Sequence, residues 1–201
     1  MTHTVRLATA DDVPALGDVL ARAFDADPIF CAILPDAGHR ARALPVLFRE
    51  WLRRLHLQHQ ATWTTDDLAG AALWSPPGKW HIGLVEEALM APRMIGALGT
   101  RVLTALRVLL AVESPHPKEP PHYYLRVLGC DTARQGQGVG ASLVRPALDR
   151  CDAEGVPAYL ESSNEKNLSF YRRHGFREIG QVATHLGPCA WLMWREPGPR
   201  P

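Results

Sequence analysis

Residues 123–140 read YYLRVLGCDTARQGQGVG and decide the fold of this chain. The first nine predict a strand, 133–140 predict a glycine-rich loop, and the following residues 141–155 predict a helix. The three glycines let the backbone turn sharply and approach a ligand closely, because glycine has no Cβ. The helix directs free N–H groups and the positive end of its dipole at the same place. The stretch therefore predicts an anion site, most simply for a phosphate or diphosphate.

Two familiar nucleotide-binding loops do not fit this spacing. A P-loop ends in Gly-Lys followed by Ser or Thr, whereas Gly140 is followed by Ala141 and Ser142. A dinucleotide-binding loop has the spacing G-x-G-x-x-G in the first strand–helix turn, whereas here it is G-x-G-x-G, late in the chain. A tight turn that binds nothing is the remaining alternative, and three glycines in five residues at a helix start favour the anion site.

The rest of the chain alternates strand-like and helix-like segments around this stretch. Together they predict a mixed α/β fold with a helical insert around 82–112. The predicted strands are 4–8, 61–67, 68–78, 156–163 and the two arms of a hairpin over 176–196, and the predicted helices are 13–25, 39–60, two within 82–112, and 167–175.

Local signals predict where some elements begin and end. Pro92 indicates that the two helices of the insert meet near Ala91 and Pro92. Residues 26–38 predict a loop, and the prolines of 114–122 predict an extended linker. In the helix at 39–60 the apolar residues form one stripe, so its arginines and histidines are expected to face water.

The composition is that of an ordinary globular protein. The chain has 201 residues, of which 46% are hydrophobic and 21% charged, and its formal net charge is +1. This length fits a single domain, predicted over 1–196, with a frayed tail at 197–201. A charge near zero argues against a protein that mainly binds nucleic acid, because such a protein usually has a clearly basic domain.

The four cysteines are dispersed and include no C-x-x-C pair, so they favour neither a zinc site nor a thioredoxin-like motif. Dispersed thiols and a beginning unlike a signal peptide suggest a reducing, cytoplasmic location. Charged residues interrupt the most apolar stretch, 82–112, so no membrane span is expected. We therefore expect no metal, no nucleic-acid partner and no membrane partner.

Two motifs follow one another in the last third of the chain, separated by a helix and a strand: Q-x-x-G-x-G over 135–140 and Y-x-x-x-G-F over 171–176. In this order they resemble the signatures of the GNAT superfamily of acetyl-CoA-dependent acetyltransferases. The stretches TVRLATADDVP, HPKEP and GVPAYLES resemble more specifically its puromycin N-acetyltransferase branch. The resemblance covers most of the chain and implies a mixed sheet flanked by helices, with splayed central strands.

The resemblance also implies where acetyl-CoA binds. In this family the strand before the glycine-rich loop carries a bulge, expected here near 128–130, whose backbone pairs with the pantetheine arm and polarises the thioester carbonyl. The loop holds the diphosphate, and an asparagine precedes the tyrosine of the second motif by seven residues. The implied coenzyme-binding residues are Leu128, Gly129, Cys130, Gln135, Gly136, Gln137, Gly138, Val139, Gly140, Ala141, Asn164 and Asn167.

The chemistry of amine acetylation points to two further residues. An ammonium group must lose a proton before its nitrogen can attack, so a base is needed. Glu161, on the predicted strand beside the site, is the candidate base, and pairing with Arg126 is its structural alternative. The resemblance implies that Tyr171 is the general acid that protonates the departing thiolate, and a packed core tyrosine is its alternative.

Other residues offer weaker candidates. Asp27 and Asp36 are candidates for binding a cationic substrate, but Asp next to Pro more often forms a turn, and this alternative is favoured. His56 and His59 have a spacing that can bind metal on a helix, but without a third ligand a solvated helix face is favoured. Four tryptophans are candidates for an aromatic acceptor pocket: Trp51, Trp63, Trp74 and Trp80. At most one or two of them are expected to touch substrate, and the others are expected to be ordinary core residues.

The resemblance implies transfer of an acetyl group from acetyl-CoA to a primary amine of a small molecule, such as a puromycin-like aminonucleoside, by direct attack in a ternary complex. Two alternatives stay open. One is acetylation of a protein or peptide amine, which an open groove would favour. The other is a non-catalytic sensor that binds acyl-CoA without turnover. The active form is expected to be a monomer or a homodimer.

Overall fold

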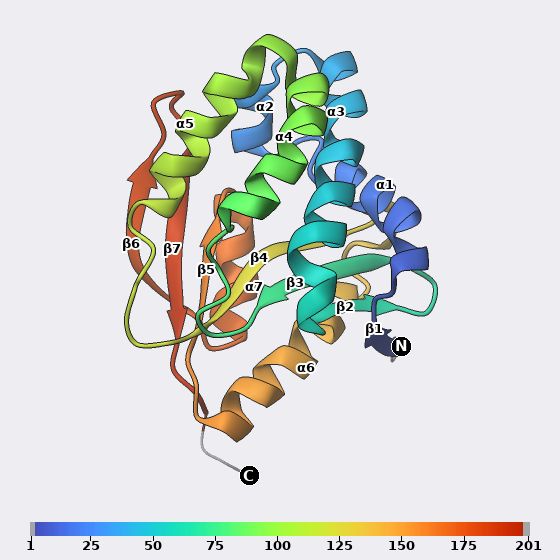
Figure 1. The fold of residues 1–201 in the computed structure, drawn as a ribbon. Coiled ribbons are helices and arrows are strands. Elements are labelled where there is room, and N and C mark those ends of the chain that lie inside the picture. Colours follow the sequence, from blue (N-terminus) through green and yellow to red (C-terminus); the bar gives the residue numbers. More distant parts are fainter. Residues whose placement is uncertain (1–2, 199–201) are drawn as a thin grey trace.

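A seven-stranded sheet runs through the computed structural model, which describes residues 3–198 (Figure 1). Its strand order is β1-β2-β3-β4-β5-β7-β6. Strands β4 and β5 are parallel, whereas the other neighbouring strands are antiparallel. The predicted mixed α/β fold is confirmed. The strands are β1 (Val5–Leu7), β2 (Thr62–Thr65), β3 (Gly70–Ser75), β4 (Tyr123–Cys130), β5 (Ala158–Ser162), β6 (Arg177–Ala183) and β7 (Cys189–Arg195).

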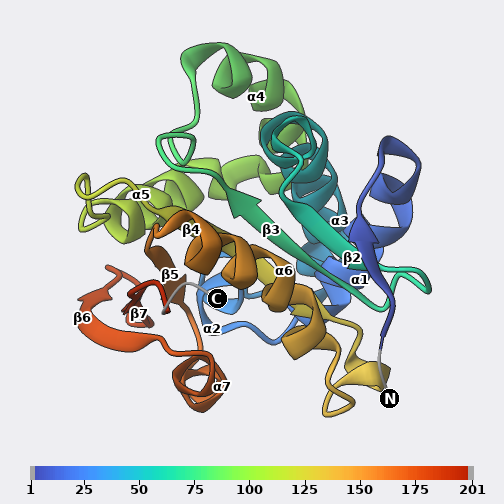
Figure 2. The ribbon, with the colours of Figure 1, turned by 90° about the horizontal axis from the view of Figure 1, so that it is seen from below.

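Helices cover both faces of this sheet (Figures 1 and 2). On one face α6 and α7 share a core with β2 to β5, and on the other α1 and α3 share a second core with β3 and β4. The insert, α4 and α5, lies on the same side as α3. The helices are α1 (Val13–Ala23), α2 (Pro28–Ile33), α3 (Ala37–Glu50), α4 (Leu84–Leu98), α5 (Val102–Glu113), α6 (Val139–Glu154) and α7 (Leu168–Arg173).

The central strand β4 contributes side chains to both cores. Residues two apart on a regular strand share a face, but the pairing of β4 with β3 shifts register between Leu125 and Val127, so Val127 points to the other face. Tyr123 and Leu125 belong to the core under α6, and Val127 belongs to the core under α1 and α3. A Cβ on Gly129 would lie 2.7 Å from Leu20, so the glycine allows α1 to pack closely against β4. The strand before the glycine-rich loop is thereby fixed from both sides.

The segment 26–38, predicted to be a loop, contains the short helix α2. Asp27 caps this helix by accepting hydrogen bonds from the amides of Ile29 and Phe30, and Pro28 occupies its first position. The Asp-Pro pair therefore starts a helix instead of forming a simple turn, because a cap followed by proline also suits a helix N-terminus. Asp36 similarly caps α3 through the amide of His39.

Helix α3 continues as a π-helical segment over Trp51–His56 and a short 3₁₀ turn over Leu57–His59, so the predicted helix at 39–60 is confirmed. The expectation that all its arginines and histidines face water is wrong. Arg40 is buried and bonds Asp25 and the carbonyl of Leu34, and His56 is fully buried. The wider π turn changes the angular spacing of the residues, so the pattern of an ideal helix misplaces His56.

The insert consists of two helices, as predicted, but they do not meet at Pro92. Helix α4 runs through Pro92 to Leu98, and the chain reverses at Gly99, where φ is +55°. Glycine adopts this conformation without the steric cost that Cβ imposes, whereas proline inside a helix can be accommodated by a local adjustment. The two helices therefore form a hairpin (Figure 1).

The insert is unusually apolar for an exposed element. The 30 residues Leu84–Glu113 are long and apolar enough for a membrane span by length and composition, although the charged residues of this stretch led us to expect none. They fold as two separate helices of 15 and 12 residues. At 1.5 Å per residue these are about 22 and 18 Å long, so each is shorter than the roughly 30 Å of a bilayer core.

The proline-rich linker 114–122 contains no helix or strand, as predicted, but it is not extended throughout: it turns at 114–115 and bends at 119–120 before leading into β4. The prolines exclude a helix, whereas contacts of the linker with itself and with the sheet bend its path. The expected frayed tail, 197–201, falls mostly outside the described residues. Within them, the amide of Gly198 donates to Asp152 on α6. The same carboxylate accepts two hydrogen bonds from Arg195 at the end of β7, so the last strand is fastened to α6.

Candidate active site

The glycine-rich loop opens α6, as the sequence predicts. Gly136 and Gly138 have φ values of +76° and +85°, and a Cβ on either would meet nothing within 4 Å. Gly138 is the N-cap of α6 and no side chain caps the helix. The amides of Val139, Gly140 and Ala141 thus lie in the first turn, where no helical carbonyl can accept from them. This open, uncapped helix start fits a diphosphate.

Strands β4 and β5 separate close to this loop. They pair at only three positions, Tyr123–Ala158, Tyr124–Tyr159 and Leu125–Leu160, while β4 continues to Cys130. Beyond the third pair, the edge of β4 that faces β5 has no strand partner among residues 3–198. The expected splay of the central strands is therefore confirmed. The unpaired backbone groups of this edge are available to an extended ligand.

The bulge of β4 lies at Arg126 and not near 128–130. Leu73 of β3 is opposite Val127 while Trp74 is opposite Leu125, so Arg126 is the extra residue. Residues 128–130 instead pair regularly with β3. The implied position was wrong by two residues, because a bulge depends on the pairing of two strands and the sequence of one strand does not show it. The bulge coincides with the point where β5 leaves β4.

Cys130 lies on the α6 side of β4, where a Cβ on Gly140 would be 3.6 Å from its Sγ. Burial raises the pKa of the Cys130 thiol to about 11. The thiol therefore stays protonated at neutral pH, and only a thiolate is a good nucleophile. Cys130 thus lines the candidate site and is not a nucleophile that accepts the acetyl group.

Tyr171 is buried on α7, between Phe170 and Phe176. Burial raises the pKa of the Tyr171 phenol well above its usual value, and the nearby Cys130 and Asp27 side chains raise it further. The burial fits the packed-core alternative, and the general-acid role stays a prediction. The phenol keeps its proton at neutral pH and lies beside the separated strands, which is what a proton donor to a leaving thiolate requires.

Glu161 lies on the other face of the sheet, because it follows Leu160, which belongs to the core under α6. The predicted alternative partner, Arg126, instead donates to Glu113 and to the carbonyl of Trp80. Glu161 faces His116, whose Nδ1 is 3.2 Å from Oε1, and both side chains are almost fully buried. The candidate acid and base therefore approach the separated strands from opposite faces.

Asp27 connects α2 to the end of β5. Besides capping α2, its carboxylate accepts a hydrogen bond from Ser163, just after β5. Burial raises the pKa of Asp27, although its hydrogen bonds oppose this shift. The carboxylate lies close enough to affect Tyr171 electrostatically. Asp27 therefore belongs to the neighbourhood of the candidate site, whereas Asp36 serves only to cap α3.

The two asparagines of the implied coenzyme site flank a short turn before α7. Asn164 starts this turn, and its Oδ1 accepts from the amide of Lys166 at 3.1 Å. Asn167 is exposed and is the N-cap position of α7 without a side-chain cap bond. Their binding of coenzyme stays a prediction, as it does for the residues of the glycine-rich loop.

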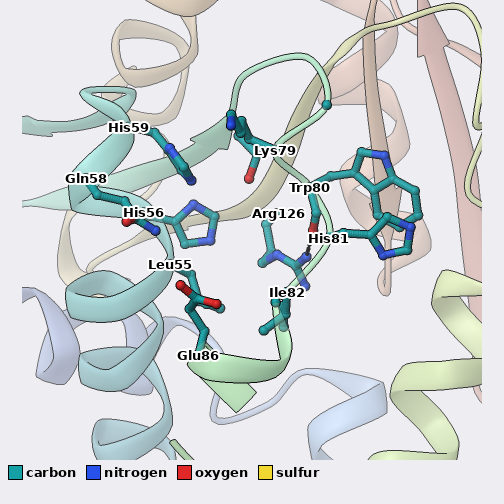
Figure 3. Close-up of a pocket in the computed structure, with 13 residues that line it drawn as sticks. Leu55, His56, Gln58, His59, Lys79, Trp80, His81, Ile82, Glu86 and Arg126 are labelled. Atoms are coloured by element: carbon teal, nitrogen blue, oxygen red, sulfur yellow. Dashed lines mark hydrogen bonds between the residues drawn. The ribbon is translucent and has the colours of Figure 1, made fainter. Parts of the chain in front are cut away.

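A polar cavity of about 360 Å³ lies beside Arg126, between the end of α3 and the loop 76–83 (Figure 3). No residue of the glycine-rich loop lines it, so it is separate from the diphosphate position. Of the four tryptophans considered, Trp80 alone lines this cavity. Trp74 is fully buried in the core, and Trp51 and Trp63 pack against the cores from their edges.

His56 and His59 both line this cavity. Burial lowers the pKa of His56 to about 3, so its ring is neutral at physiological pH. Its Nδ1 lies 3.3 Å from the carbonyl of Trp74, and its buried Nε2 has no protein partner within the described residues. Within residues 3–198 no three His, Cys, Asp or Glu side chains are grouped as metal ligands would be.

The model of the acetyltransferase (GNAT) family matches residues 33–176. This chain belongs to that family. It is an acetyltransferase, and acetyl-CoA is the acetyl donor that the family uses. The matched region includes the separated strands, the glycine-rich loop and the tyrosine of α7, so the family's signature lies where the structure opens the sheet.

Similar proteins include an uncharacterized N-acetyltransferase of Schizosaccharomyces pombe, 25% identical over 83% of this chain and 71% of the relative. The N-alpha-acetyltransferase RimI of Mycobacterium tuberculosis is 36% identical over 40% of this chain and 54% of its own. A Corynebacterium glutamicum structure described as histone acetyltransferase HPA2 and related acetyltransferase has a TM-score of 0.74 at 27% identity, covering 98% of both chains. None of these comparisons shows a specific similarity to puromycin N-acetyltransferase.

The structure brings together more polar groups than the sequence suggested. Tyr171, Cys130 and the start of α6 converge on one face, and Glu161 lies on the other. Sequence reasoning missed His116 and His122, which lie in the proline-rich linker before β4. Two histidines spaced six apart among prolines match no motif, so no local signal could have placed them against β5.

Proposed function

We propose that this acetyltransferase transfers the acetyl group of acetyl-CoA to a primary amine of a small molecule, by direct attack in a ternary complex. The observation that carries the proposal is the separation of β4 from β5, with Tyr171 and Glu161 approaching from opposite faces. A thioester between the strands could then be attacked from the Glu161 side while its sulfur faces the Tyr171 side.

The reaction balances with these two residues. Glu161 takes a proton from the acceptor's ammonium group, directly or through water, and the nitrogen attacks the thioester carbonyl. The C–N bond forms and the C–S bond breaks. Tyr171 gives its proton to the departing thiolate and regains one from solvent. In this proposal, backbone N–H groups along the free edge of β4 stabilise the oxyanion of the tetrahedral intermediate.

The covering of the Glu161 face favours a small acceptor. Helix α2 is held over the end of β5 by the bond between Ser163 and Asp27, and α2 packs with the insert in one apolar cluster. A long peptide would need an open groove across this face. The resemblance of several stretches to puromycin N-acetyltransferases supports an aminonucleoside acceptor, and hence a role in antibiotic resistance within the cytoplasm.

A peptide acceptor is the second candidate, and the similarity to RimI favours it. RimI is an N-alpha-acetyltransferase, and its 36% identity to this chain extends over 87 residues. The two candidates differ in the acceptor and share the same acetyl donor and the same separated strands. They are therefore distinguished by substrate and not by coenzyme binding.

The experiment is a thiol-release assay with acetyl-CoA against a panel of amines that includes puromycin, simple arylalkylamines and peptides with free N-termini. Turnover of small amines well above that of the peptides supports the proposal. Turnover of peptides alone supports the second candidate. If the protein binds acetyl-CoA but no amine in the panel causes thiol release, both candidate functions are overturned.

Gly138→Val tests the diphosphate position. Gly138 has φ of +85°, where a branched side chain is strained, and its new Cβ would enter the open space beside the loop. We expect acetyl-CoA binding, measured by calorimetry, to weaken at least about a hundredfold through loss of several backbone contacts to the diphosphate.

The matched control is Gly99→Val in the turn of the insert. Gly99 also has a positive φ, and a Cβ added there would meet no atom within 4 Å, but this turn is remote from α6. The variant should bind acetyl-CoA like the unmodified protein. Equal binding by both variants would show that the loop does not hold the diphosphate.

A further inference from the structure

Three consecutive hydrogen-bond contacts lead from Glu161 to the linker before β4. Nδ1 of His116 is 3.2 Å from Oε1 of Glu161, and its Nε2 is 3.0 Å from Nε2 of His122. Nδ1 of His122 is in turn 2.8 Å from the carbonyl oxygen of Pro120. Glu161 is the candidate base, and neither histidine has a role in the reaction described so far.

Aromatic packing fixes the two imidazole rings. His116 is stacked on Trp80, with 3.8 Å between ring centroids, and His81 stacks on Trp80 as well. His122 meets Tyr159 and Trp194 edge to face. Both histidines are buried, at 4% and 2% exposure. The rings therefore cannot turn freely, and their hydrogen-bonding atoms keep the positions that the distances show.

The positions of the protons follow from the far end of this series. A carbonyl oxygen only accepts, so Nδ1 of His122 must carry a proton that it donates to Pro120. Two imidazole nitrogens 3.0 Å apart need one proton between them, so either His116 or His122 donates at Nε2. Glu161 and Nδ1 of His116 likewise share one proton.

Counting these protons gives the charge of the group. Three hydrogen bonds require three protons, whereas a carboxylate with two neutral imidazoles has only two. When all three hydrogen bonds are formed, Glu161, His116 and His122 together therefore hold one additional proton and have zero net charge. That proton can lie on the carboxyl of Glu161, on His116 or on His122, and each arrangement satisfies all three hydrogen bonds without rotating a ring.

We propose that Glu161, His116 and His122 form a relay for a single proton, in which the proton that Glu161 takes from the acceptor is passed to the histidines. This inference rests on the proposed function for the role of Glu161. His116 and His122 touch no substrate, so they are positioning residues that act through the carboxylate. The proton ends away from the reacting nitrogen, and Glu161 becomes a carboxylate again.

The relay also strengthens the base. When the additional proton is absent, one of the three hydrogen bonds cannot form, and the lone pairs of two imidazole nitrogens can face each other. Uptake of a proton by Glu161 restores the missing bond. The relay thus increases the proton affinity of the group, and the enzyme should become active only above the pH at which the relay gives up that proton.

The charged and titratable groups around the relay come from five segments of the chain. Arg126 and Tyr124 of β4 and Tyr159 of β5 lie beside Glu161, and Glu113 of α5 pairs with Arg126. Glu119 of the linker and His81 of the loop before α4 complete the set. Burial lowers the pKa of Arg126, whereas the nearby Tyr124, Glu113 and Glu161 side chains raise it, and the net shift is upward, so its guanidinium stays charged beside the relay.

The first experiment observes the protons directly. Nitrogen NMR of the ¹⁵N-histidine-labelled full chain reports which ring nitrogens of His116 and His122 are protonated. We expect a protonated Nδ1 on His122 and a single shared titration of the two rings with pH. Two independent titrations of ordinary imidazoles would overturn the relay. This measurement needs no acceptor, so it decides the relay even if the proposed function fails.

The second experiment uses His122→Gln, whose amide can turn to donate to or accept from Nε2 of His116. The variant keeps a hydrogen bond in both protonation states, so the state without the additional proton is no longer penalised. We expect the acidic limb of the kcat/KM profile to move to lower pH by about one unit, because one pH unit corresponds to the net free energy that one hydrogen bond contributes.

His39→Gln is the matched control. His39 is half-buried and bonds the carbonyl of Ala97 through Nε2, where a glutamine amide can replace it. The acidic limb of the kcat/KM profile of His39→Gln should coincide with that of the unmodified enzyme. An acidic limb of His122→Gln that also coincides, in a variant with native melting temperature, would overturn the proposal. If His122→Gln does not fold, the NMR measurement alone decides.

Discussion

Tyr171 shows how packing and chemistry can share one residue. The aromatic neighbours that bury its ring also exclude water from its hydroxyl, and this burial raises its pKa. A phenol that never ionises near neutral pH always has a proton to give. The thiolate of coenzyme A is a good leaving group, so this proton assists the reaction without being indispensable.

Replacement of Tyr171 by Phe should therefore lower kcat by about ten- to a hundredfold and change KM little, because a proton donor acts mainly in the transition state. Steady-state kinetics at several pH values measure this effect. Tyr123→Phe is the control: Tyr123 donates to Glu154 on α6, on the part of β4 that is still paired. Equal kcat values for the two variants would exclude the acid role.

Residue identities were easier to predict than residue partners. The sequence singled out Glu161 from its place on a strand beside the glycine-rich loop, but it offered Arg126 as the partner. The actual partner, His116, comes from a linker 45 positions away in the chain. Such a contact depends on how the linker folds back, and no periodicity of either segment records it. Similarly, His56 is buried because α3 changes to a π turn.

At the scale of elements, the junction of β1 and α1 depends on one carboxylate. Asp12 accepts two hydrogen bonds from Arg6 of β1, at 2.7 and 2.8 Å, and one from the amide of Thr9. The Arg6 guanidinium lowers the pKa of Asp12 to about 2. Strand and helix are thereby joined just before the first core residues of α1.

Asp12→Asn should destabilise the protein at neutral pH, and the difference should disappear in acid. The folded-state pKa lies below the unfolded value of about 4, so the stabilisation is complete above pH 4 and is lost as the pH falls toward about 2. Urea unfolding at a series of pH values measures it. Asp11→Asn, at the exposed neighbour, should show no such pH-dependent difference.

The boundaries of elements were predictable where a terminating residue acts alone. Gly155 ends α6 in a left-handed conformation, as its position after a helical pattern suggests. The break in the insert was misplaced, because both Pro92 and Gly99 could end a helix and the sequence does not rank them. The structure shows that the residue able to reverse the chain, Gly99, decides.

At the scale of the whole molecule, Glu50 connects the insert to the body of the protein. This carboxylate is only 1% exposed and contacts three arginines: Arg53, Arg54 and Arg93. The last of these belongs to α4, whereas Glu50 itself ends α3. A buried carboxylate surrounded by cations replaces its lost hydration with charge-assisted hydrogen bonds.

Glu50→Ala should lower the free energy of unfolding by about 2 kcal/mol, less than for a fully buried pair because its arginine partners are partly exposed. Chemical denaturation measures this loss. Glu87→Ala, on the exposed surface of α4, should change it by no more than about 0.5 kcal/mol. Similar values for both variants would show that Glu50 does not hold the insert.

The overall topology could be predicted because a parallel strand pair linked by a helix, with hairpins on either side, leaves few arrangements. The sequence did not reveal how α2, the insert and the linker cover the Glu161 face. Those contacts join segments with no common pattern, so acceptor choice is the least predictable property of the chain.

The short pairing of β4 with β5 has a mechanical consequence. Only three residue pairs join the half of the sheet formed by β1 to β4 to the half formed by β5, β7 and β6, so the sheet is weakest between β4 and β5. A ligand bound between β4 and β5 would bridge the two strand edges that the protein itself leaves unpaired. Pulling the two halves in opposite directions should therefore separate β4 from β5 first, and the force needed should be higher when a ligand is bound between them.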